Sequence, residues 1–236
     1  MKSSPPRARK SRCRESEGRA RDALSITKRS FGILAIQTWP AMATARTPHA
    51  DSRLPLLLDE AARLFRARGF EGTSMRDIAR AVGMLPGSLY WHFETKEALL
   101  VAVYVKGVQQ ISSAVQVAID RQEDPWERLE AACVAHLEAI LHDDDYAQVV
   151  IRVRPADVPV VQQSLVELRN QYEALFTRLV AGLPLARGAD RRALRLMLMG
   201  AMNWSQTWYR PGGRFNPRSI ARRFIALLRQ GQEAIA

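Results

Sequence analysis

The segment from Ser74 to Phe93, SMRDIARAVGMLPGSLYWHF, most strongly constrains what this chain can fold into. From Met75 to Val82 its apolar residues recur at the i, i+3, i+4 and i+7 spacing of one helical face. Gly83 follows at a place where a helix end adopts left-handed backbone, which glycine reaches without strain. Pro86 suits the first turn of a second helix, because its missing N–H has no partner there. The segment therefore predicts two short helices joined by a glycine turn.

Capping residues indicate where these helices begin. Ser74 can accept a hydrogen bond from the first helical turn, and Asp77 can reach back to the amide of Ser74. Leu85, by contrast, offers no acceptor to the second helix, so that helix is expected to lack a side-chain cap. Thr95 is expected to cap a third helix that begins at Lys96.

The second helix carries residue types that suit a DNA groove. Small residues at its tip let the backbone approach a base edge, and its hydroxyl and imidazole groups can donate hydrogen bonds to phosphate oxygens. A major groove about 12 Å wide admits such a helix. Leu89 and Phe93, four residues apart, are expected to face inward. The residues expected to face DNA are Gly87, Ser88, Tyr90, Trp91 and His92, with a core position as the alternative for Tyr90.

Lys96 is a separate indication of phosphate binding. It follows the Thr95 cap and so places a cation in the first turn of a helix, where the helix dipole disfavours positive charge. A phosphate at the start of that helix would be held by the free amides and the ammonium together. The alternative is a solvated surface lysine that carries a small energetic penalty.

From about Leu57 to Leu100 the chain resembles the DNA-binding domain of the TetR family of bacterial transcriptional regulators. The resemblance implies a three-helix, helix-turn-helix domain that binds double-stranded DNA. One departure is Leu85, which stands where the family usually has a Ser or Thr cap. The features that carry the resemblance are, in order, Glu60, Ala61, Ala62, Leu64 and Phe65, then Gly69, Phe70 and Thr73, then Asp77, Ile78 and Ala79, then Gly83, and finally LYWHF followed by TKEALL.

The resemblance also implies roles for individual side chains. Arg76, which faces outward on the first helix of the pair, is included in the expected DNA-binding set. Phosphate contacts are implied for Thr73, Ser74, Tyr90, His92 and Lys96. Base-reading places are implied for Pro86, Gly87, Ser88 and Trp91.

Net charge alone does not identify the DNA-binding part. The chain has a formal charge of +11, and residues 1–50 hold eleven Lys or Arg against three Asp or Glu. Residues 51–100 hold seven of each sign, so DNA binding there must depend on where the charges point. The leader is rich in Arg, Ser and Pro and poor in large apolar side chains, so we expect it to be disordered. A translation start at Met42 would remove most of it.

Beyond residue 100 the pattern is helical throughout, so we expect an all-α protein. No stretch reaches the roughly 20 consecutive apolar residues of a membrane span, and no membrane partner is expected. The run Asp143 to Asp145 is expected to be a solvated break between helices, with a divalent cation site as the alternative. Helices are expected over 96–119, from 125 after the Asp124 cap, over 149–153, 159–181 and about 190–208, and from 217 after the Asn216 cap.

The expected organisation is a leader at 1–50, a DNA-binding domain at 51–100, and an effector-binding and dimerisation domain at 101–236. The last two helices are the expected dimer interface, because the first of them is apolar on two faces. Two helices from each copy would pack as a four-helix bundle, which the TetR resemblance also implies. A homodimer would present two recognition helices about 34 Å apart, so its operator should be an inverted repeat.

Residues 201–213, AMNWSQTWYRPGG, resemble a TetR subgroup whose members sense acyl-CoA thioesters. Aromatic walls, adaptable Met side chains and one amide suit a small apolar or amphipathic effector, and Arg152 and Arg154 could pair with its anionic head group. The alternative is that these aromatic side chains form the core of the dimer interface. The expected pocket residues are Trp126, His136, Arg152, Tyr172, Met197, Asn203, Trp204 and Trp208.

We expect a cytoplasmic, ligand-released repressor that binds DNA as a homodimer and uses no cofactor or metal, with an acyl-CoA as a candidate effector. An enzyme is disfavoured because the chain has no phosphate-binding glycine loop and no nucleophile elbow. Cys13 and Cys133 are too few for a disulfide framework, which suits a reducing compartment. The alternative is an architectural DNA-binding protein that responds to no ligand.

Overall fold

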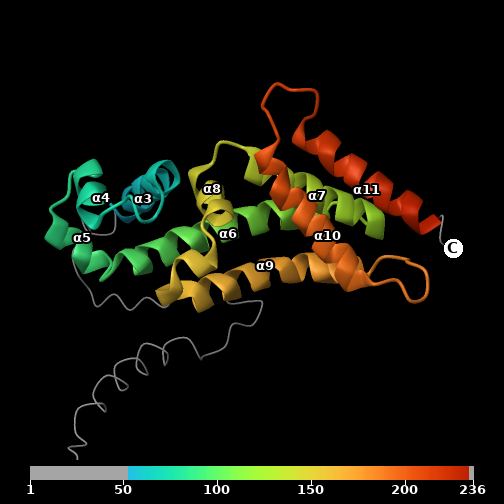
Figure 1. Ribbon diagram of the computed structural model, residues 1–236, viewed down its shortest axis with the longest axis horizontal. Coiled ribbons are helices and arrows are strands. Elements are labelled where there is room, and N and C mark those ends of the chain that lie inside the picture. The colour runs from blue at the N-terminus through green and yellow to red at the C-terminus, as the bar shows by residue number, and fades with distance from the viewer. Residues whose placement is uncertain (1–52, 234–236) are drawn as a thin grey trace, which may run out of the picture. The chain divides into compact units, whose positions relative to one another are not determined.

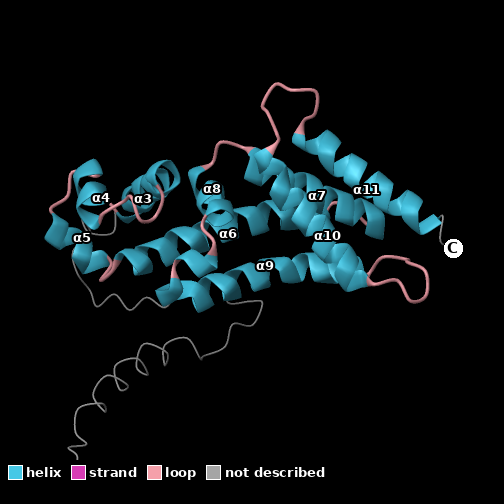
Figure 2. Ribbon diagram, in the orientation of Figure 1, coloured by secondary structure: helices cyan, strands magenta, loops and turns pink. Residues whose placement is uncertain are grey.

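The computed structural model describes residues 53–233, with side chains through Gly231, and all regular structure in that range is helical (Figure 1, Figure 2). The predicted all-α class is therefore confirmed. The described residues belong to one compact unit, His49–Ala236. The predicted disordered leader at 1–50 and the start at Met42 lie outside the described residues.

The described part consists of α-helices with short 3₁₀ turns between some of them. The α-helices are α3 (Leu54–Arg68), α4 (Met75–Ala81), α5 (Pro86–His92), α6 (Lys96–Ile119), α7 (Pro125–Leu141), α8 (Asp145–Arg152), α9 (Gln162–Ala181), α10 (Arg191–Trp204) and α11 (Pro217–Glu233). The 3₁₀ turns are η2 (Pro155–Asp157), η3 (Pro159–Val161) and η4 (Ser205–Thr207).

The helix starts follow the predicted caps. The Asp77 N–H donates to the Ser74 hydroxyl and the Ser74 N–H donates to the Asp77 carboxylate, both at 3.2 Å, so the capping box is complete. Gly83 has a φ of 63°, as the turn between α4 and α5 requires. Leu85 precedes α5 without a side-chain hydrogen bond, and Asp124 accepts from the first turn of α7.

Three helices differ from the predicted bounds. α9 begins at Gln162 rather than residue 159, because Pro159–Val161 form the 3₁₀ turn η3. The other two differ because of local side-chain bonds. α8 begins at Asp145 rather than residue 149, since the Asp144 carboxylate accepts from the Ala147 N–H at 2.8 Å and caps the helix there. α10 ends at Trp204 rather than about residue 208. The Ser205 hydroxyl donates to the Met202 carbonyl at 2.6 Å, and the chain tightens into η4.

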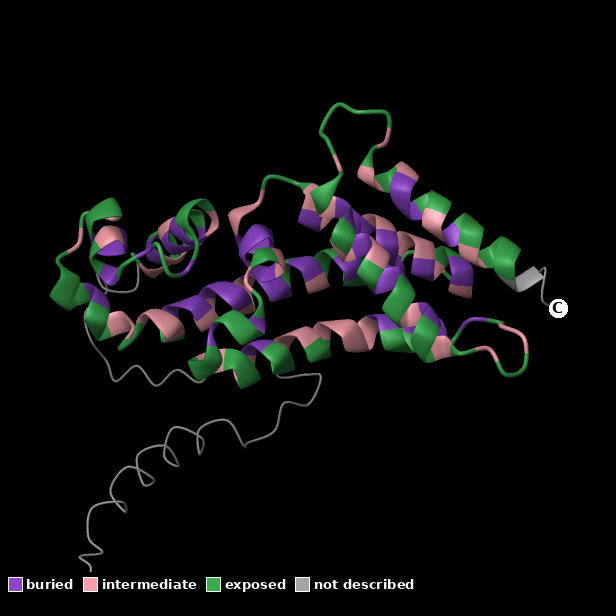
Figure 3. Cartoon of the chain, in the orientation of Figure 1, coloured by how far each residue is buried: buried purple, intermediate pink, exposed green. Residues whose placement is uncertain are grey.

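α6 is the central helix of the described unit. It has the predicted bounds and packs against α3, α7, α8 and α9 (Figure 1). Its mean hydropathy reaches 1.4 over an 18-residue window, so by length and composition it could span a membrane, contrary to the expectation that no stretch would. Its apolar side chains instead face neighbouring helices, and buried positions recur along its length (Figure 3). Leu99, Val103, Tyr104 and Val115 are fully buried. α6 is a core helix in this fold.

Gly107 allows α6 and α8 to approach backbone to backbone. A Cβ at Gly107 would lie 2.7 Å from Val150 Cγ2 and 2.8 Å from the Tyr146 carbonyl oxygen. One turn earlier, the Tyr104 hydroxyl donates to the Val150 carbonyl at 3.3 Å. The position of α8 against the central helix therefore depends on the missing side chain at Gly107.

We expect Gly107→Ala to lower the free energy of unfolding by about 1–3 kcal/mol, because the added methyl meets α8 backbone that cannot easily move. Helix propensity alone would favour alanine by roughly 0.5–1 kcal/mol. Urea denaturation followed by circular dichroism measures the difference. Gly231→Ala is the matched control, since that helical glycine has no atom within 4 Å of the added Cβ and should not lose stability. A Gly107→Ala protein as stable as the wild type would contradict the close approach.

Candidate DNA-recognition surface and effector cavity

α5 presents most of its side chains to solvent. Leu89 is fully buried and Phe93 is half-buried, as their spacing predicts. Trp91 is 58% exposed and Tyr90 is 48% exposed, so Tyr90 is not a core aromatic residue. The Trp91 and His92 rings meet in a T-shaped arrangement, with their centroids 4.9 Å apart. An aromatic surface therefore faces outward from α5.

The tip of α5 is open. Pro86, Gly87 and Ser88 are exposed, and no atom lies within 4 Å of a Cβ built at Gly87. Arg76 is likewise exposed on α4, and Ser74 is exposed at the α4 cap. The structure thus leaves nine of the ten sequence-predicted DNA-binding residues at least partly accessible: Ser74, Arg76, Pro86, Gly87, Ser88, Tyr90, Trp91, His92 and Lys96.

Thr73 does not present its side chain to DNA. It is 1% exposed, and its hydroxyl donates to the carbonyl oxygens of Gly69 at 2.8 Å and Leu64 at 3.2 Å. Those bonds tie the end of α3 to the start of α4. The expected phosphate contact from this side chain is therefore wrong, because its hydroxyl is buried and holds the turn together.

Lys96 has a structural partner that the sequence did not reveal. Its ammonium donates to the Phe70 carbonyl oxygen at 2.8 Å and lies 4.1 Å from the centre of the Phe70 ring. Its Nζ also lies 4.0 Å from a Glu71 carboxylate oxygen. The contacts with Phe70 thus explain why a positively charged side chain stands in the first turn of α6, since they hold α6 to the α3–α4 connection. Lys96 is therefore not a solvated surface lysine, and its contact with phosphate stays a prediction.

A small cavity lies between α6, α7, α8, α9 and α10. Its volume is about 30 Å³, which is room for a water-sized molecule. Three sequence-predicted pocket residues, His136, Tyr172 and Asn203, line it together. The other lining residues are Val108, Ile111, Val150, Ile151, Arg169, Glu173 and Met199.

His136 is the centre of a polar chain at this cavity. Its Nδ1 lies 2.6 Å from the Tyr172 hydroxyl and its Nε2 lies 3.1 Å from Asn203 Oδ1. A neutral ring satisfies both contacts when Nε2–H donates to Asn203 and Nδ1 accepts from Tyr172. Burial lowers the pKa of His136 to about 4, against a smaller opposing effect of its Asn203 hydrogen bond. Burial likewise raises the pKa of Tyr172 well above its usual value.

The remaining sequence-predicted pocket residues lie elsewhere. Trp126 is buried beside α11, with the Arg229 guanidinium 5.5 Å from its ring centre. Arg152 is exposed at the end of α8. Met197, Trp204 and Trp208 are 58%, 67% and 45% exposed, and none of them lines the cavity. The residues from 201 to 213 therefore contribute only Asn203 to it.

Arg169 and Glu173 line the cavity but were missed by the sequence analysis. Both lie on α9, on the same helical face as Tyr172, at the i, i+3 and i+4 spacing. Arg195 of α10 donates to Glu173 at 2.5 Å, whereas Arg169 has no acidic partner among the residues with described side chains. The spacing from Tyr172 was the signal that could have identified them.

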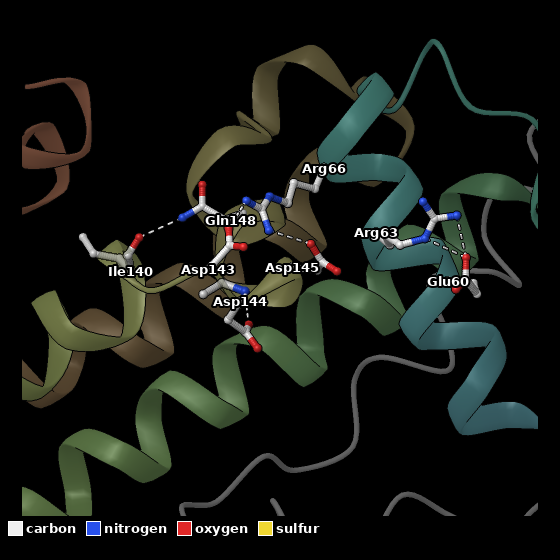
Figure 4. A network of polar contacts seen from close by, with 9 residues as sticks. Glu60, Arg63, Arg66, Ile140, Asp143, Asp144, Asp145 and Gln148 are labelled. Carbon is white, nitrogen blue, oxygen red and sulfur yellow. Dashed lines mark hydrogen bonds and ion pairs between the residues drawn. The ribbon is translucent and has the colours of Figure 1, made fainter. Parts of the chain in front are cut away.

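α8 connects this cavity to α3 through polar contacts (Figure 4). Arg66 of α3 pairs with Asp143 and, at 2.8 Å, with Asp145. The run from Asp143 to Asp145, predicted to be a solvated break, thus holds two partners of Arg66. The buried Gln148 side chain of α8 donates to the Ile140 carbonyl of α7 at 2.8 Å and so holds α8 on α7. Arg63 points to Glu60 within α3 and makes no such link (Figure 4).

A second polar contact lies beside the first. The Tyr146 hydroxyl of α8 donates to Asp59 of α3 at 2.6 Å, and Lys106 of α6 donates to both groups. Burial and the Asp59 carboxylate raise the pKa of Tyr146. Three helices therefore meet at one cluster of polar side chains.

Two family models match the chain. Residues 57–103 match the model of bacterial regulatory proteins of the tetR family, and residues 122–232 match the tetracyclin repressor-like C-terminal domain. The HTH-type transcriptional repressor KstR2 of Mycolicibacterium smegmatis is 33% identical over 189 residues, which cover 76% of this chain and 90% of that protein. The chain belongs to the TetR family.

Solved structures of TetR-family regulators share the fold. AibR, crystallised with isovaleryl coenzyme A and operator DNA, superposes with a TM-score of 0.65 at 24% identity, over 74% of this chain and 97% of AibR. The ketosteroid transcriptional regulator KstR2 of Mycobacterium tuberculosis gives a TM-score of 0.60 at 23% identity, over 80% of this chain and 97% of KstR2. At these identities the likeness shows the fold.

Membership in the TetR family makes this chain a transcriptional regulator and not an enzyme. The family features predicted from Leu57 to Leu100 coincide with the first matched model. The helix-turn-helix of α4 and α5 is followed by a helical C-terminal part, as predicted.

The burial of His136 predicts that the stability of the protein depends on pH. Because its folded-state pKa lies below the unfolded value, the unfolded chain binds a proton first as the pH falls, and stability is lost from about pH 6.5 down toward pH 4. The loss is about 3 kcal/mol over that window. His136→Gln has no histidine to protonate at this position. The difference in the free energy of unfolding between the wild type and this variant should therefore decrease as the pH falls.

Urea unfolding at several pH values between 4 and 7 measures the two curves. His142→Gln, a histidine change at an exposed position, should follow the wild-type profile. A deficit of His136→Gln that stays constant with pH would show that His136 is not held neutral by burial.

Proposed function

We propose that this protein is a repressor that holds an inverted-repeat operator as a homodimer and releases it when a small molecule binds. The observation that carries the proposal is the position of α8. Val150 and Ile151 of α8 line the cavity, whereas Asp145 and Tyr146 of the same helix contact α3. A displacement of α8 at the cavity therefore reaches the segment that matches the tetR DNA-binding model.

Residues 51–100 act as the DNA-binding domain in this proposal. α5 enters the major groove, with its accessible tip and aromatic face toward the bases and its hydroxyl and imidazole groups toward phosphate. Lys96 holds α6 to the α3–α4 connection, and so sets the angle at which α5 leaves the body of the protein.

Residues 101–236 serve for dimerisation and effector binding. Leu196, Met197, Trp204 and Trp208 are large apolar side chains that α10 and η4 leave in solvent, and Leu227 of α11 is 66% exposed. Exposed apolar surface of this kind marks an interaction site, and a second copy covers it in a two-fold bundle. This exposure favours the dimer interface, rather than the effector pocket, as the place of Met197, Trp204 and Trp208.

The effector must widen the cavity in order to bind. A volume of about 30 Å³ is far below the roughly 300–1,000 Å³ of ligand pockets, so an effector must push apart the helices that line it. It then prefers a shape other than the one described, which is the condition for release. A coupling of about 1–3 kcal/mol would lower operator affinity about 5- to 150-fold.

The lining suits an amphipathic effector. Its apolar walls take a hydrocarbon body, the His136 chain offers hydrogen bonds, and Arg169 supplies a positive charge. AibR, which was crystallised with isovaleryl coenzyme A, supports an acyl-CoA as the class to test first. A regulator of this kind works where the chromosome lies, in the cytoplasm.

Selection of bound fragments from genomic DNA with the full-length protein, followed by nuclease footprinting of those fragments, would give the operator. Gel shifts on that operator then compare the protein with and without isovaleryl-CoA and longer acyl-CoAs. Protection of discrete inverted repeats with release by one of these compounds is expected. Even protection of unrelated DNA would contradict the proposal and favour an architectural protein.

Met197→Glu should convert the dimer to a monomer, because a carboxylate at the centre of an apolar interface would be buried without a partner. Analytical ultracentrifugation measures the assembly, and operator affinity should fall with it. Val160→Glu changes a side chain that is 82% exposed in η3 and should leave the dimer intact. A dimeric Met197→Glu protein would place the interface elsewhere.

Arg66→Gln should weaken the effector response more than operator binding, because it removes the link from α3 to Asp143 and Asp145. Changes along such a contact alter coupling by about 0.5–2 kcal/mol, which is about 2- to 30-fold in effector-driven release. Arg63→Gln is the matched control, since its partner Glu60 lies on the same helix. Equal responses of the two variants in the operator gel shift would reject α8 as the connecting element.

A further inference from the structure

The recognition helix has an unusual composition for a helix that reads bases. α5, PGSLYWH, contains no Arg, Lys, Asn, Gln, Asp or Glu. Guanine is read in the major groove mainly by Arg or Lys, adenine by Asn or Gln, and cytosine by Asp or Glu. A hydroxyl such as that of Ser88 bonds to several bases and discriminates poorly. With the His92 imidazole directed to phosphate, as in the proposed function, the base feature left for α5 to distinguish is the 5-methyl group of thymine, which is read by apolar contact.

Leu85 supplies an apolar group at the place where such contact would occur. It is 77% exposed, directly before α5, and its side chain makes no capping bond. A Ser, Thr, Asp or Asn at this position would stabilise the helix, so helix stability does not explain the leucine. Trp91, 58% exposed, adds a second large apolar group to the same short helix.

The surroundings of Leu85 allow close approach to DNA. Pro86 and Gly87 follow it, and a Cβ at Gly87 would meet no atom within 4 Å. The backbone at the tip of α5 can therefore approach the base edges in the major groove closely, with the Leu85 side chain between that backbone and the bases. An apolar side chain left in water at that place gains free energy when it covers a methyl group.

We infer that Leu85 is a specificity-determining residue that reads thymine 5-methyl groups in the major groove, with Trp91 adding apolar contact. The half-site under α5 is then specified by thymine rather than by guanine. The inference rests on the proposed function, because it requires that α5 enters operator DNA.

Deoxyuridine tests this contact, because it pairs as thymine does and lacks only the methyl group. In operator fragments selected with the full-length protein, each thymine of the half-site is replaced in turn, and Kd is measured by fluorescence anisotropy at one salt concentration. Loss of one buried methyl should raise Kd about fourfold, and loss of the equivalent methyl in both half-sites about 15-fold.

Variants at position 85 separate an effect on thymine preference from an effect on the stability of the protein. Leu85→Ala should bind thymine and deoxyuridine sites within about twofold of each other. Leu85→Ser should also lose the methyl preference, although it restores a helix cap and should therefore unfold at higher urea concentration. Val160→Ala, an exposed apolar residue in η3, should keep the wild-type preference.

Two results would overturn the inference. One is a half-site in which no thymine replacement changes Kd of the wild type by more than twofold. The other is the same deoxyuridine penalty in the wild type and in Leu85→Ala. A protein that shows no preference among duplexes at all would instead contradict the proposed function, so the two failures are distinguishable.

Discussion

The burial of α6 is the interaction on which the rest of the structure depends. At about 1.5 Å per residue its 24 residues span about 36 Å, and side chains are buried from Leu99 near its start to Ile119 at its end. It packs against α3, Lys96 in its first turn is tied to the α3–α4 connection, and Val108 and Ile111 near its middle line the cavity. One rigid element thus belongs to both functional parts, and a tilt at one end moves the other.

α8 adds a second path between the same parts. It rests on α6 through the space that Gly107 leaves, and that apolar contact fixes its depth. The ion pairs of Arg66 and the Asp59, Tyr146 and Lys106 cluster are partly exposed, and such pairs contribute little to stability. They can therefore be rearranged at small cost. A two-state regulator requires a core that resists movement next to contacts that can be rearranged, and α6 and α8 combine the two.

Much of this fold follows from local chemistry in the sequence. Ser74, Asp124 and Asn216 cap the helices that they were predicted to cap, and the amphipathic stripe of α6 gives its bounds. Such signals act over a few residues, so they can be read without knowledge of the tertiary structure. The predicted domain boundaries at residues 50 and 100 stay predictions.

The polar contacts could not be derived in this way. Lys96 meets a carbonyl 26 residues away, and His136 meets partners 36 and 67 residues away on two other helices. Thr73 stands at a position where the family resemblance implies a phosphate contact, yet its buried hydroxyl donates to the Gly69 carbonyl instead. α10 is apolar on two faces, and sequence alone does not tell which face its own chain covers. That is why Met197 and Trp204 were expected in a pocket and lie in solvent instead.

The most direct measurement is the distance between the two DNA-binding domains of a dimer, by electron spin resonance on a label at Arg80→Cys in a Cys13→Ser background. Arg80 is exposed on α4, and burial raises the pKa of the remaining Cys133 thiol, which keeps it unreactive. We expect a narrow distribution on operator DNA that shifts when an effector releases it. An identical distribution with and without effector, in a protein that nevertheless leaves its operator, would contradict the account.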